Sequence, residues 1–450
     1  MDFRTQSKIV KSGLASRRGF RSFLGSIVSV FAVTAYGCAT TDVSSPKEAS
    51  AEPEIVTTIT GPNTPVEIVT GAGYSLIPKN FSELPAWQST NFSSARLSFL
   101  ASCKKWSKQN TEKQLSKSAP YGGIISDWMG ACLGLKAVVE PDAIADVFQT
   151  EFTPYLIKPK NDSSKLTGYF EPELEAKYSP QGKFTKSVPG IPEDLVRVDP
   201  SKFEKKFSSG KVWGRVKDGE LELYPDRKDI IDDPKKALGF VTPGELFYLQ
   251  IQGSGRIKFP DGRVIRAAFA AHNHKSFVSI ARHLIDSGQI QPHQAGMGSI
   301  LKWMDEVGPK KAQDAMNVNP RYVWFTPQEL LDPNKGPNGA QGVALTPMAS
   351  MAVDPRYHPY GAPIFIDTRI PSEPGDWKGT EFSSLVIAQD TGGAIKGILR
   401  GDLFFGWGHK AGGRAASMNH DVDMWVLLPK RLAEKMANAQ IRKNSEMSNG

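Results

Sequence analysis

Cysteine and histidine are both scarce in this sequence, which limits the metal chemistry that it can support. Only 3 of the 450 residues are cysteine, and no two of them form a CxxC pair. The 7 histidines form no HExxH or comparable ligand pattern. Zinc sites need such closely spaced ligands, so we expect no metal site and no cofactor.

Long apolar runs and basic runs are also absent. With 40% hydrophobic and 23% charged residues, the chain is neither wholly disordered nor a polytopic membrane protein. The apolar stretch at residues 23–36 is too short for a membrane-spanning helix, which needs about 20 residues. The net charge is +8, but residues 1–37 contribute +5 of it. The small remaining charge predicts no nucleic-acid partner.

The first 37 residues have the layout of an export signal. Arg17 to Arg21 precede the apolar stretch, and the small residues Ala35 and Gly37 follow it. The run SRRGF at residues 16–20 also resembles a twin-arginine export motif, so that route and the general export route both stay open.

Cys38 directly follows this segment and has two interpretations. Gly37-Cys38 followed by Ala-Thr-Thr resembles a bacterial lipobox, in which Cys38 is lipidated and becomes the first residue of the mature chain. Ordinary signal cleavage after Gly37 is the alternative. Residues 39–70 are rich in Ser, Thr, Pro and Glu, which predicts a flexible tether over residues 38–72.

Helical periodicity is the main signal in residues 94–157. Apolar residues recur there at helical spacing, among them Leu97 and Leu133. Cys103 and Cys132 fall in the same region. In an oxidising compartment they are a candidate disulfide that would join two helices, and two separate buried thiols are the alternative.

From Lys165 onwards the pattern changes to short strands broken by Gly, Pro and Asp. Asp261-Gly262 stands between two such runs and predicts a hairpin. We also expect helix over about 275–316 and a frayed helix from Lys430. Strands are expected at residues 211–216, 221–224, 246–252, 256–259, 343–345, 362–366, 384–388 and 425–428. The fold class is therefore mainly β with some α, and the short strands favour small barrels over a doubly wound sheet.

Three aspartates at the ends of expected strands are candidates for acid/base chemistry. Asp367 and Asp390 follow apolar strands, and Asp402 opens another beside the aromatic residues at 404, 405 and 407. Acids at strand ends can meet at one mouth of a barrel, and apolar neighbours would raise the pKa of Asp402, as a general acid requires. Turn formation is the alternative, because Asp side chains bond to nearby backbone.

Two further stretches carry side chains suited to sugar recognition. Gln250, Gln252 and Ser254 lie in QIQGSG, where the amides would share one face of a strand before a Gly-rich turn. That turn lacks the lysine of a phosphate-binding loop. Tyr169 and Glu171 lie in TGYFEP, where an aromatic ring could stack on a sugar. An exposed hairpin and ordinary core packing are the respective alternatives.

Taken together and in their order, these motifs resemble one family. They are GYFEP at 168–172, QIQGSG at 250–255, NPRYV at 319–323, GVALTP at 342–347, SMAVD at 350–354 and DTGGAIKG at 390–397. On these motifs, residues 80–430 resemble the membrane-bound lytic murein transglycosylase A family. Residues 340–428 resemble its 3D domain, named for three aspartates, which here look like Asp367, Asp390 and Asp402. The chain departs from the family pattern at residues 269–274 and in the loop between Asp390 and Asp402.

The resemblance implies a double-psi β-barrel that is discontinuous in sequence. It would be formed by residues 73–166 and 317–430, with a smaller β-domain of residues 167–316 inserted as the other wall of a groove. Residues 431–450 would form a tail.

The resemblance also implies an activity and its site residues. The family cleaves peptidoglycan without consuming water, and Asp402 would be the single acid/base, supported by Asp390. Further support would come from Asp367, and substrate would be bound by Tyr169, Glu171, Gln250, Gln252, Ser254 and Lys396. A hydrolase that uses Asp402 and Asp390 as a pair, a non-catalytic glycan-binding lipoprotein and a purely structural lipoprotein are the alternatives.

The resemblance places the protein at the periplasmic face of the outer membrane of a Gram-negative bacterium, as a lipoprotein or as a soluble periplasmic protein. Its expected partners are peptidoglycan glycan strands, outer-membrane lipid through Cys38, and complexes of cell-wall synthesis or division.

Overall fold

A computed structural model describes residues 65–160, 164–204 and 212–448 of the chain. The expected export signal, Cys38 and the expected tether up to residue 64 lie outside the described residues. No helix in these three ranges is long and apolar enough to cross a membrane.

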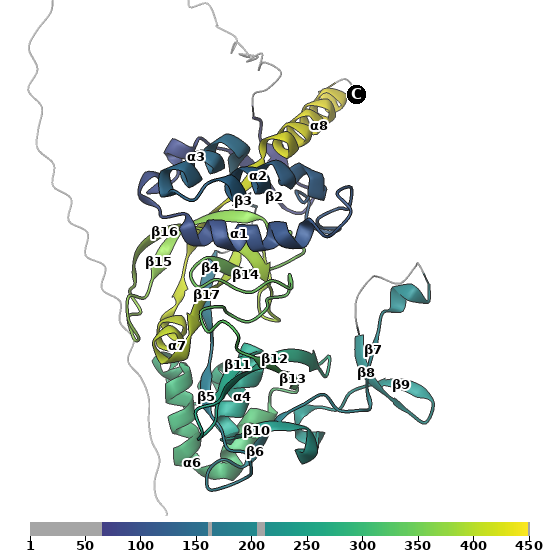
Figure 1. Cartoon of the computed structure of the whole chain (residues 1–450), viewed down its shortest axis with the longest axis vertical. Coiled ribbons are helices and arrows are strands. Elements are labelled where there is room, and N and C mark those ends of the chain that lie inside the picture. The colour runs from purple at the N-terminus through teal and green to yellow at the C-terminus, as the bar shows by residue number, and fades with distance from the viewer. Residues whose placement is uncertain (1–64, 161–163, 205–211, 449–450) are drawn as a thin grey trace, which may run out of the picture. The chain divides into compact units, whose positions relative to one another are not determined.

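Ten strands pair into one large sheet (Figure 1). Most neighbours are antiparallel, but β14 pairs in parallel with β16, and β17 pairs in parallel with β4. The strand order is β1 (Ile68–Val69), β2 (Tyr74–Pro78), β3 (Phe152–Pro159), β19 (Val422–Pro429), β15 (Pro363–Ile370), β16 (Thr380–Asp390), β14 (Ser350–Val353), β17 (Arg400–Trp407), β4 (Lys165–Glu171) and β18 (Asn419–His420). The class is mainly β with some α, as predicted. This pairing has β1 and β18 at its ends, and the double-psi barrel stays a prediction.

The central strands are buried on both faces. Residues 364–366 of β15, 385–388 of β16 and 426–428 of β19 are continuous apolar runs that are fully buried. Strands covered on both faces show such runs, whereas strands with one wet face show alternation. The predicted strand at 343–345 is wrong, because only Ala344 forms an isolated bridge there.

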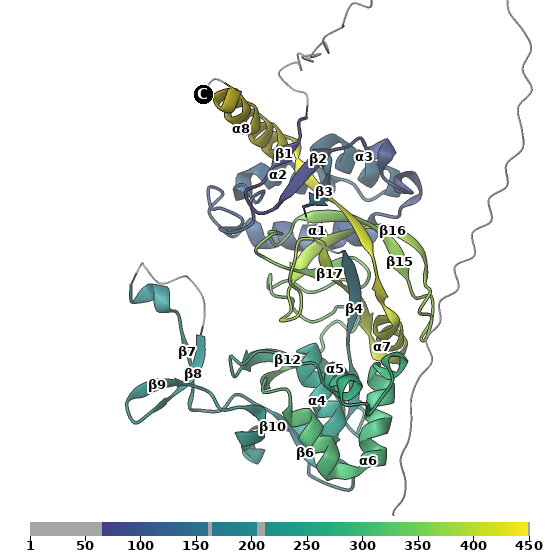
Figure 2. The same cartoon turned by 180° about the vertical axis from the view of Figure 1, so that it is seen from behind.

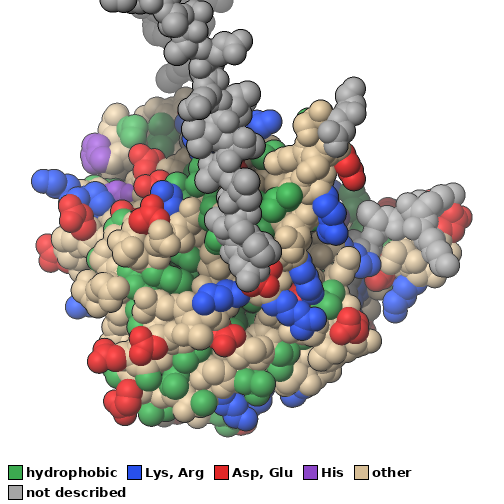
Figure 3. Space-filling model, turned by 90° about the horizontal axis from the view of Figure 1, so that it is seen from above, with side chains coloured by type: hydrophobic (Ala, Val, Ile, Leu, Met, Phe, Trp, Pro, Cys, Tyr) green, Lys and Arg blue, Asp and Glu red, His purple; other side chains and the backbone are tan. Residues whose placement is uncertain are grey.

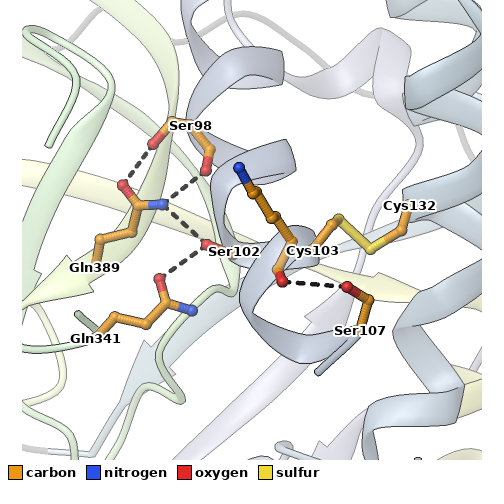
Figure 4. The surroundings of a disulfide bond; sticks show 8 residues. Ser98, Ser102, Cys103, Ser107, Cys132, Gln341 and Gln389 are labelled. Carbon is orange, nitrogen blue, oxygen red and sulfur yellow. Dashed lines mark hydrogen bonds between the residues drawn. A yellow bond between two sulfur atoms is a disulfide. The ribbon is translucent and has the colours of Figure 1, made fainter. Parts of the chain in front are cut away.

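Three helices cover part of this sheet: α1 (Ser93–Trp106), α2 (Ile125–Ala137) and α3 (Pro141–Glu151). They lie together at one end of the large sheet (Figures 1 and 2). Cys103 of α1 and Cys132 of α2 form a disulfide, which confirms the predicted pair (Figure 4). Leu97 and Leu133 lie in α1 and α2, as the helical spacing predicted, but they are 58% and 66% exposed and do not belong to the core. The surface above the helices mixes basic, acidic and apolar side chains (Figure 3).

The C-terminal segment is a helix whose first part packs on the protein, while residues 441–448 are exposed. Helix α8 (Lys430–Ser448) contacts β1, β3 and β19 and buries Leu432, Ala433 and Ala437. Asp127 of α2 accepts a 2.6 Å hydrogen bond from Lys435. The apolar stripe at three- and four-residue spacing explains why this segment docks.

Helix α7 (Gly408–Ser417) packs on β4 and β17 of the large sheet. The region of the chain between β4 and β14, here called the insert, carries three further sheets and three α-helices. Its strands form three sheets, β13 (Val323–Glu329), β12 (Val264–His272), β11 (Gly255–Lys258) and β5 (Glu173–Glu175); β10 (Ala237–Val241) and β6 (Lys186–Pro189); and β7 (Leu195–Val198), β8 (Val212–Lys217) and β9 (Glu220–Leu223). Its helices are α4 (Pro243–Gln252), α5 (Ile280–Asp286) and α6 (Met297–Asn317). The hairpin at Asp261-Gly262 is confirmed by the β11–β12 pair. Strand β4 pairs with β17 of the large sheet, and β13 pairs with β12 of the insert; the predicted domain boundaries stay a prediction.

The predicted strand at residues 246–252 is wrong, since this stretch is helix α4. Thr242 and Glu245 form a capping box, Pro243 occupies the first turn, and Gly253 ends the helix at a φ of +82°. Residues 246–250 are all buried, so the helix has no polar face to show its period. The capping residues Thr242, Glu245 and Gly253 indicate a helix here, although the apolar pattern between them shows no helical period.

A buried ionic cluster ties the insert to the large sheet at both chain crossings. The carboxylate of Glu171 accepts hydrogen bonds from Arg256 at 3.0 Å and from Arg266 at 2.5 Å. The same arginines donate to the carbonyl oxygens of Pro333 and Lys335 on the returning chain. The carboxylate and the two backbone carbonyls accept hydrogen bonds from the guanidinium groups of both arginines. These donors would otherwise be buried without partners.

Candidate active site

A cavity of about 650 Å³ lies between the large sheet and the insert. Thr167, Tyr169, Asp390 and Asp402 line it from the sheet, and the loop 337–340 adds backbone. From the insert it is lined by α4 and the turn after it, by Phe269 and His272 of β12, and by Arg321. Both structural parts therefore contribute walls to one site.

Strand register brings Asp390 and Asp402 to the same place. Ala352 of β14 pairs with Asp402 on its antiparallel neighbour β17 and with Asp390 on its parallel neighbour β16. The two acids are thus one strand apart on either side of Ala352, and both line the cavity. The predicted convergence of these two strand-end acids is confirmed.

The environment of Asp402 suits a group that gains and loses a proton. Its half-buried carboxyl accepts a 2.5 Å hydrogen bond from Thr167 at Oδ1. Burial raises the pKa of Asp402 to about 6, against the opposing effects of the Thr167 hydroxyl and the Arg400 charge. Within the described residues, no hydrogen bond is formed to Oδ2 of Asp402. A carboxyl group whose pKa lies near neutral pH, and which has one oxygen free of hydrogen bonds, can act first as an acid and then as a base.

Asp390 is held more tightly than Asp402. Its Oδ1 accepts from the backbone amides of Ala340 at 2.8 Å and Thr391 at 2.9 Å, and its Oδ2 accepts from the Tyr169 hydroxyl at 2.9 Å. Burial raises the pKa of Asp390, while the three donors oppose that rise. Both carboxylate oxygens of Asp390 accept hydrogen bonds, so Asp390 holds the cavity wall in place. Its negative charge raises the pKa of Asp402.

Helix α1 anchors the strand that carries Asp390 (Figure 4). The side chain of Gln389 accepts a 2.6 Å hydrogen bond from the Ser98 hydroxyl and donates to the Ser98 carbonyl and the Ser102 hydroxyl. Ser102 in turn donates to Gln341 at 2.8 Å. The buried amide of Gln389, with both its oxygen and its nitrogen satisfied in this way, fixes one arrangement of the backbone. The network therefore positions Asp390 and the neighbouring loop at 337–341.

The QIQGSG stretch lines the cavity from a helix and its C-terminal turn. Gln250 is buried, accepts from Arg227 at 2.5 Å and donates to the carbonyl oxygen of Val323 at 2.9 Å. Gln252 is partly exposed and accepts a 3.4 Å hydrogen bond from the amide of Phe170. Ser254 also lines the cavity. Gln250 thus maintains the wall, and Gln252 and Ser254 are the members better placed to meet a ligand.

Three predicted site residues lie outside the cavity lining. The carboxylate of Glu171 is taken up by the ionic cluster with Arg256 and Arg266, so a structural role replaces its expected substrate contact. Lys396 is exposed on the loop after Asp390. Asp367 lies inside β15 rather than at its end and accepts from the Ser383 hydroxyl at 2.5 Å. Its expected convergence with the other two acids is therefore wrong.

Four residues of the site were not predicted from the sequence: Thr167, Arg400, His272 and Arg321. Thr167 reaches Asp402 because β4 and β17 pair in parallel, a contact across 235 residues that no local pattern encodes. His272 and Arg321 lie in the segments FAAHNH (269–274) and NPRYV (319–323), for which the sequence predicted no role. Among the described residues, no three His, Cys, Asp or Glu side chains cluster closely enough to hold a metal ion.

Comparison with known proteins finds two domain models and several relatives. The family model described as MltA specific insert domain matches residues 165–326, and the 3D domain model matches residues 349–428. The chain is 30% identical to membrane-bound lytic murein transglycosylase A of Vibrio cholerae over 271 residues, which cover 60% of this chain and 66% of that protein. The chain spans just under two thirds of the length of the curated relatives that it matches.

Solved structures of the same kind are similar over most of the chain. The membrane-bound lytic murein transglycosylase of Agrobacterium tumefaciens aligns with a TM-score of 0.68 and 26% identity, over 80% of this chain and 99% of that one. MltA of Neisseria gonorrhoeae aligns with a TM-score of 0.67 and 27% identity, over 82% of this chain and 96% of that one. With the two domain models in order and the fold shared, the chain belongs to the membrane-bound lytic murein transglycosylase A family.

Proposed function

We propose that this protein is a lytic transglycosylase that cleaves the β-1,4 bond between N-acetylmuramic acid and N-acetylglucosamine in peptidoglycan. The observation that carries the proposal is Asp402: a carboxyl with a pKa of about 6, in a cavity built from two structural parts, with one oxygen held by Thr167. Family membership supports the substrate class.

The reaction needs one acid/base. Protonated Asp402 donates its proton to the glycosidic oxygen, and the bond from that oxygen to C1 of the muramic acid breaks through an oxocarbenium-like state. The resulting carboxylate takes the proton of the C6 hydroxyl, whose oxygen bonds to C1 and closes a 1,6-anhydro ring. Asp402 ends protonated again, and no water is consumed. Because the nucleophile belongs to the substrate, its effective concentration is high and a second carboxylate is unnecessary.

The hydrogen bonds of Asp390 favour this route over hydrolysis. A hydrolase with two carboxylates needs the second one as a nucleophile or as a base for water. Both oxygens of Asp390 already accept hydrogen bonds, from Ala340, Thr391 and Tyr169. We assign Asp390 to holding backbone and tuning the pKa of Asp402, and Tyr169, Gln252 and Ser254 to contact with the glycan.

The proposal extends to fold and location. The large sheet is proposed to be the double-psi barrel of the family, with its parallel β4–β17 and β14–β16 pairs as the crossing strands. The protein is proposed to act on glycan strands in the periplasm, as an outer-membrane lipoprotein through Cys38. Complexes of cell-wall synthesis or division are its proposed protein partners.

Turnover of purified peptidoglycan by substituted proteins tests the assignment. Asp402→Asn should abolish product formation while glycan binding persists. Asp390→Asn should lower the turnover rate without abolishing it. Asp367→Asn is the matched control, since that acid lies outside the cavity lining, and it should stay active. Full activity in Asp402→Asn would remove the proposed acid/base.

A further inference from the structure

Arg321 is a cation on the insert side of the cavity without a carboxylate partner. It lines the cavity and donates one hydrogen bond, from Nη1 to the carbonyl oxygen of Lys275 at 3.2 Å. No ion pair among the described residues includes it, and burial lowers its pKa. The acids of the cavity lining, Asp390 and Asp402, have hydrogen bonds from other donors. A partly buried guanidinium that retains unused donors is suited to bind an anion, and a carboxylate matches its planar fork.

His272 adds a neutral donor beside this cation. Its Nδ1 accepts a 2.9 Å hydrogen bond from the backbone amide of His274, which assigns the ring proton of the neutral form to Nε2. Burial, the charge of Arg321 and the charged form of His274 together lower the pKa of His272 to about 4. The ring is therefore neutral at pH 7, and His272 adds an N–H donor to the cavity lining without a second positive charge.

Aromatic rings border the same part of the cavity. Phe277 lines it, and Phe269 does so while 46% exposed, with its ring centroid 6.1 Å from that of His272. A neutral sugar offers hydroxyl and amide groups but no anion for Arg321. A ligand that carries a carboxylate next to apolar carbon matches all four side chains.

We propose that Arg321 and His272 bind a carboxylate carried by the muramic acid residue, either on its lactyl group or on its stem peptide. This inference rests on the proposed function, because it assigns the part of the peptidoglycan substrate that this end of the cavity recognises. It makes Arg321 a specificity-determining residue that separates peptidoglycan from a neutral chitin-like glycan.

Binding of three tetrasaccharides to the full chain tests the proposal, with Asp402→Asn as the background that stops turnover. The probes are a neutral N-acetylglucosamine tetramer, an alternating N-acetylglucosamine–N-acetylmuramic acid tetramer with free lactyl carboxylates, and the same tetramer with stem peptides. Arg321→Met should weaken binding of the carboxylate ligands about ten-fold or more and leave the neutral tetramer unchanged. Arg321→Lys should fall between, since it keeps the charge without the fork.

Two controls make the test specific. Arg282→Met removes an exposed arginine that pairs with Asp286 on α5, and it should change no affinity. Should Arg321→Met not fold, the unsubstituted side chain still decides: affinity for carboxylate ligands should fall with rising salt, and affinity for the neutral tetramer should not.

The ligands separate the two sources of the carboxylate. Loss confined to the peptide-free glycan assigns the lactyl carboxylate, and loss confined to the stemmed glycan assigns the peptide. Equal loss for the neutral tetramer, or no loss for either carboxylate ligand, overturns the proposal. Failure of all three to bind the Asp402→Asn background would instead contradict the proposed function itself.

Discussion

Thr167 and Asp402 are register partners on the parallel strands β4 and β17, and the Thr167 hydroxyl donates a 2.5 Å hydrogen bond to Asp402. The same hydroxyl accepts a 2.8 Å hydrogen bond from Nη2 of Arg400. Thr167 therefore links the guanidinium of Arg400 to the carboxyl of Asp402 through two hydrogen bonds, and no direct ion pair is formed between them among the described residues. This stabilises the ionised form of Asp402 and opposes the rise in its pKa that burial causes.

Removing the Thr167 hydroxyl should move the pH dependence of the enzyme. Cleavage begins with protonated Asp402, so kcat/KM falls as pH rises through its pKa. Thr167→Val deletes a hydrogen bond to the ionised form, and the alkaline limb of the profile should shift upward by about one pH unit. Thr167→Ser keeps the hydroxyl and should restore the original profile. An unchanged limb in Thr167→Val would show that this hydrogen bond does not set the pKa.

The raised pKa of Asp402 also predicts a stability cost near neutral pH. Below the ordinary aspartate pKa the carboxyl is neutral in both folded and unfolded chains. Between about pH 4 and pH 6 the unfolded chain gives up this proton while the folded chain retains it, so stability is lost across that window and stays lower at neutral pH. Asp402→Asn should therefore stabilise the fold at pH 7 by on the order of 2–3 kcal/mol, with the gain vanishing below pH 4. Urea unfolding at both pH values measures it, and an equal effect at both would contradict the argument.

The disulfide between α1 and α2 should contribute to stability. Cys103 and Cys132 are 29 residues apart, and closing a loop of that length stabilises a fold by about 3–4 kcal/mol. Replacing both cysteines by alanine should lower the free energy of unfolding by about that amount, as measured by urea titration. Reductant should destabilise the unsubstituted protein and leave the double variant unchanged. If reductant had no effect on the unsubstituted protein, the bond would not contribute.

The sequence predicted local features better than contacts between distant strands. Asp390, Asp402 and the hairpin at Asp261 were found because each is bounded by its own strand and turn signals. Thr167 was missed because its relation to Asp402 depends on a parallel pairing across most of the chain. The amides of α4 were assigned to a strand because a helix buried on all sides loses its period, although Thr242 and Gly253 marked its ends. Asp367 looked equivalent to the other acids because the length of β15 could not be read from its apolar run.

Digestion of purified peptidoglycan in oxygen-18 water, followed by mass spectrometry of the soluble products, distinguishes a transglycosylase from a hydrolase. A transglycosylase uses the C6 hydroxyl of its substrate, so we expect 1,6-anhydro-muramic ends that carry no heavy oxygen. A hydrolase places one solvent oxygen in each new end. Reducing ends labelled with oxygen-18 would rule out the transglycosylase reaction and give Asp390 a direct part in activating water.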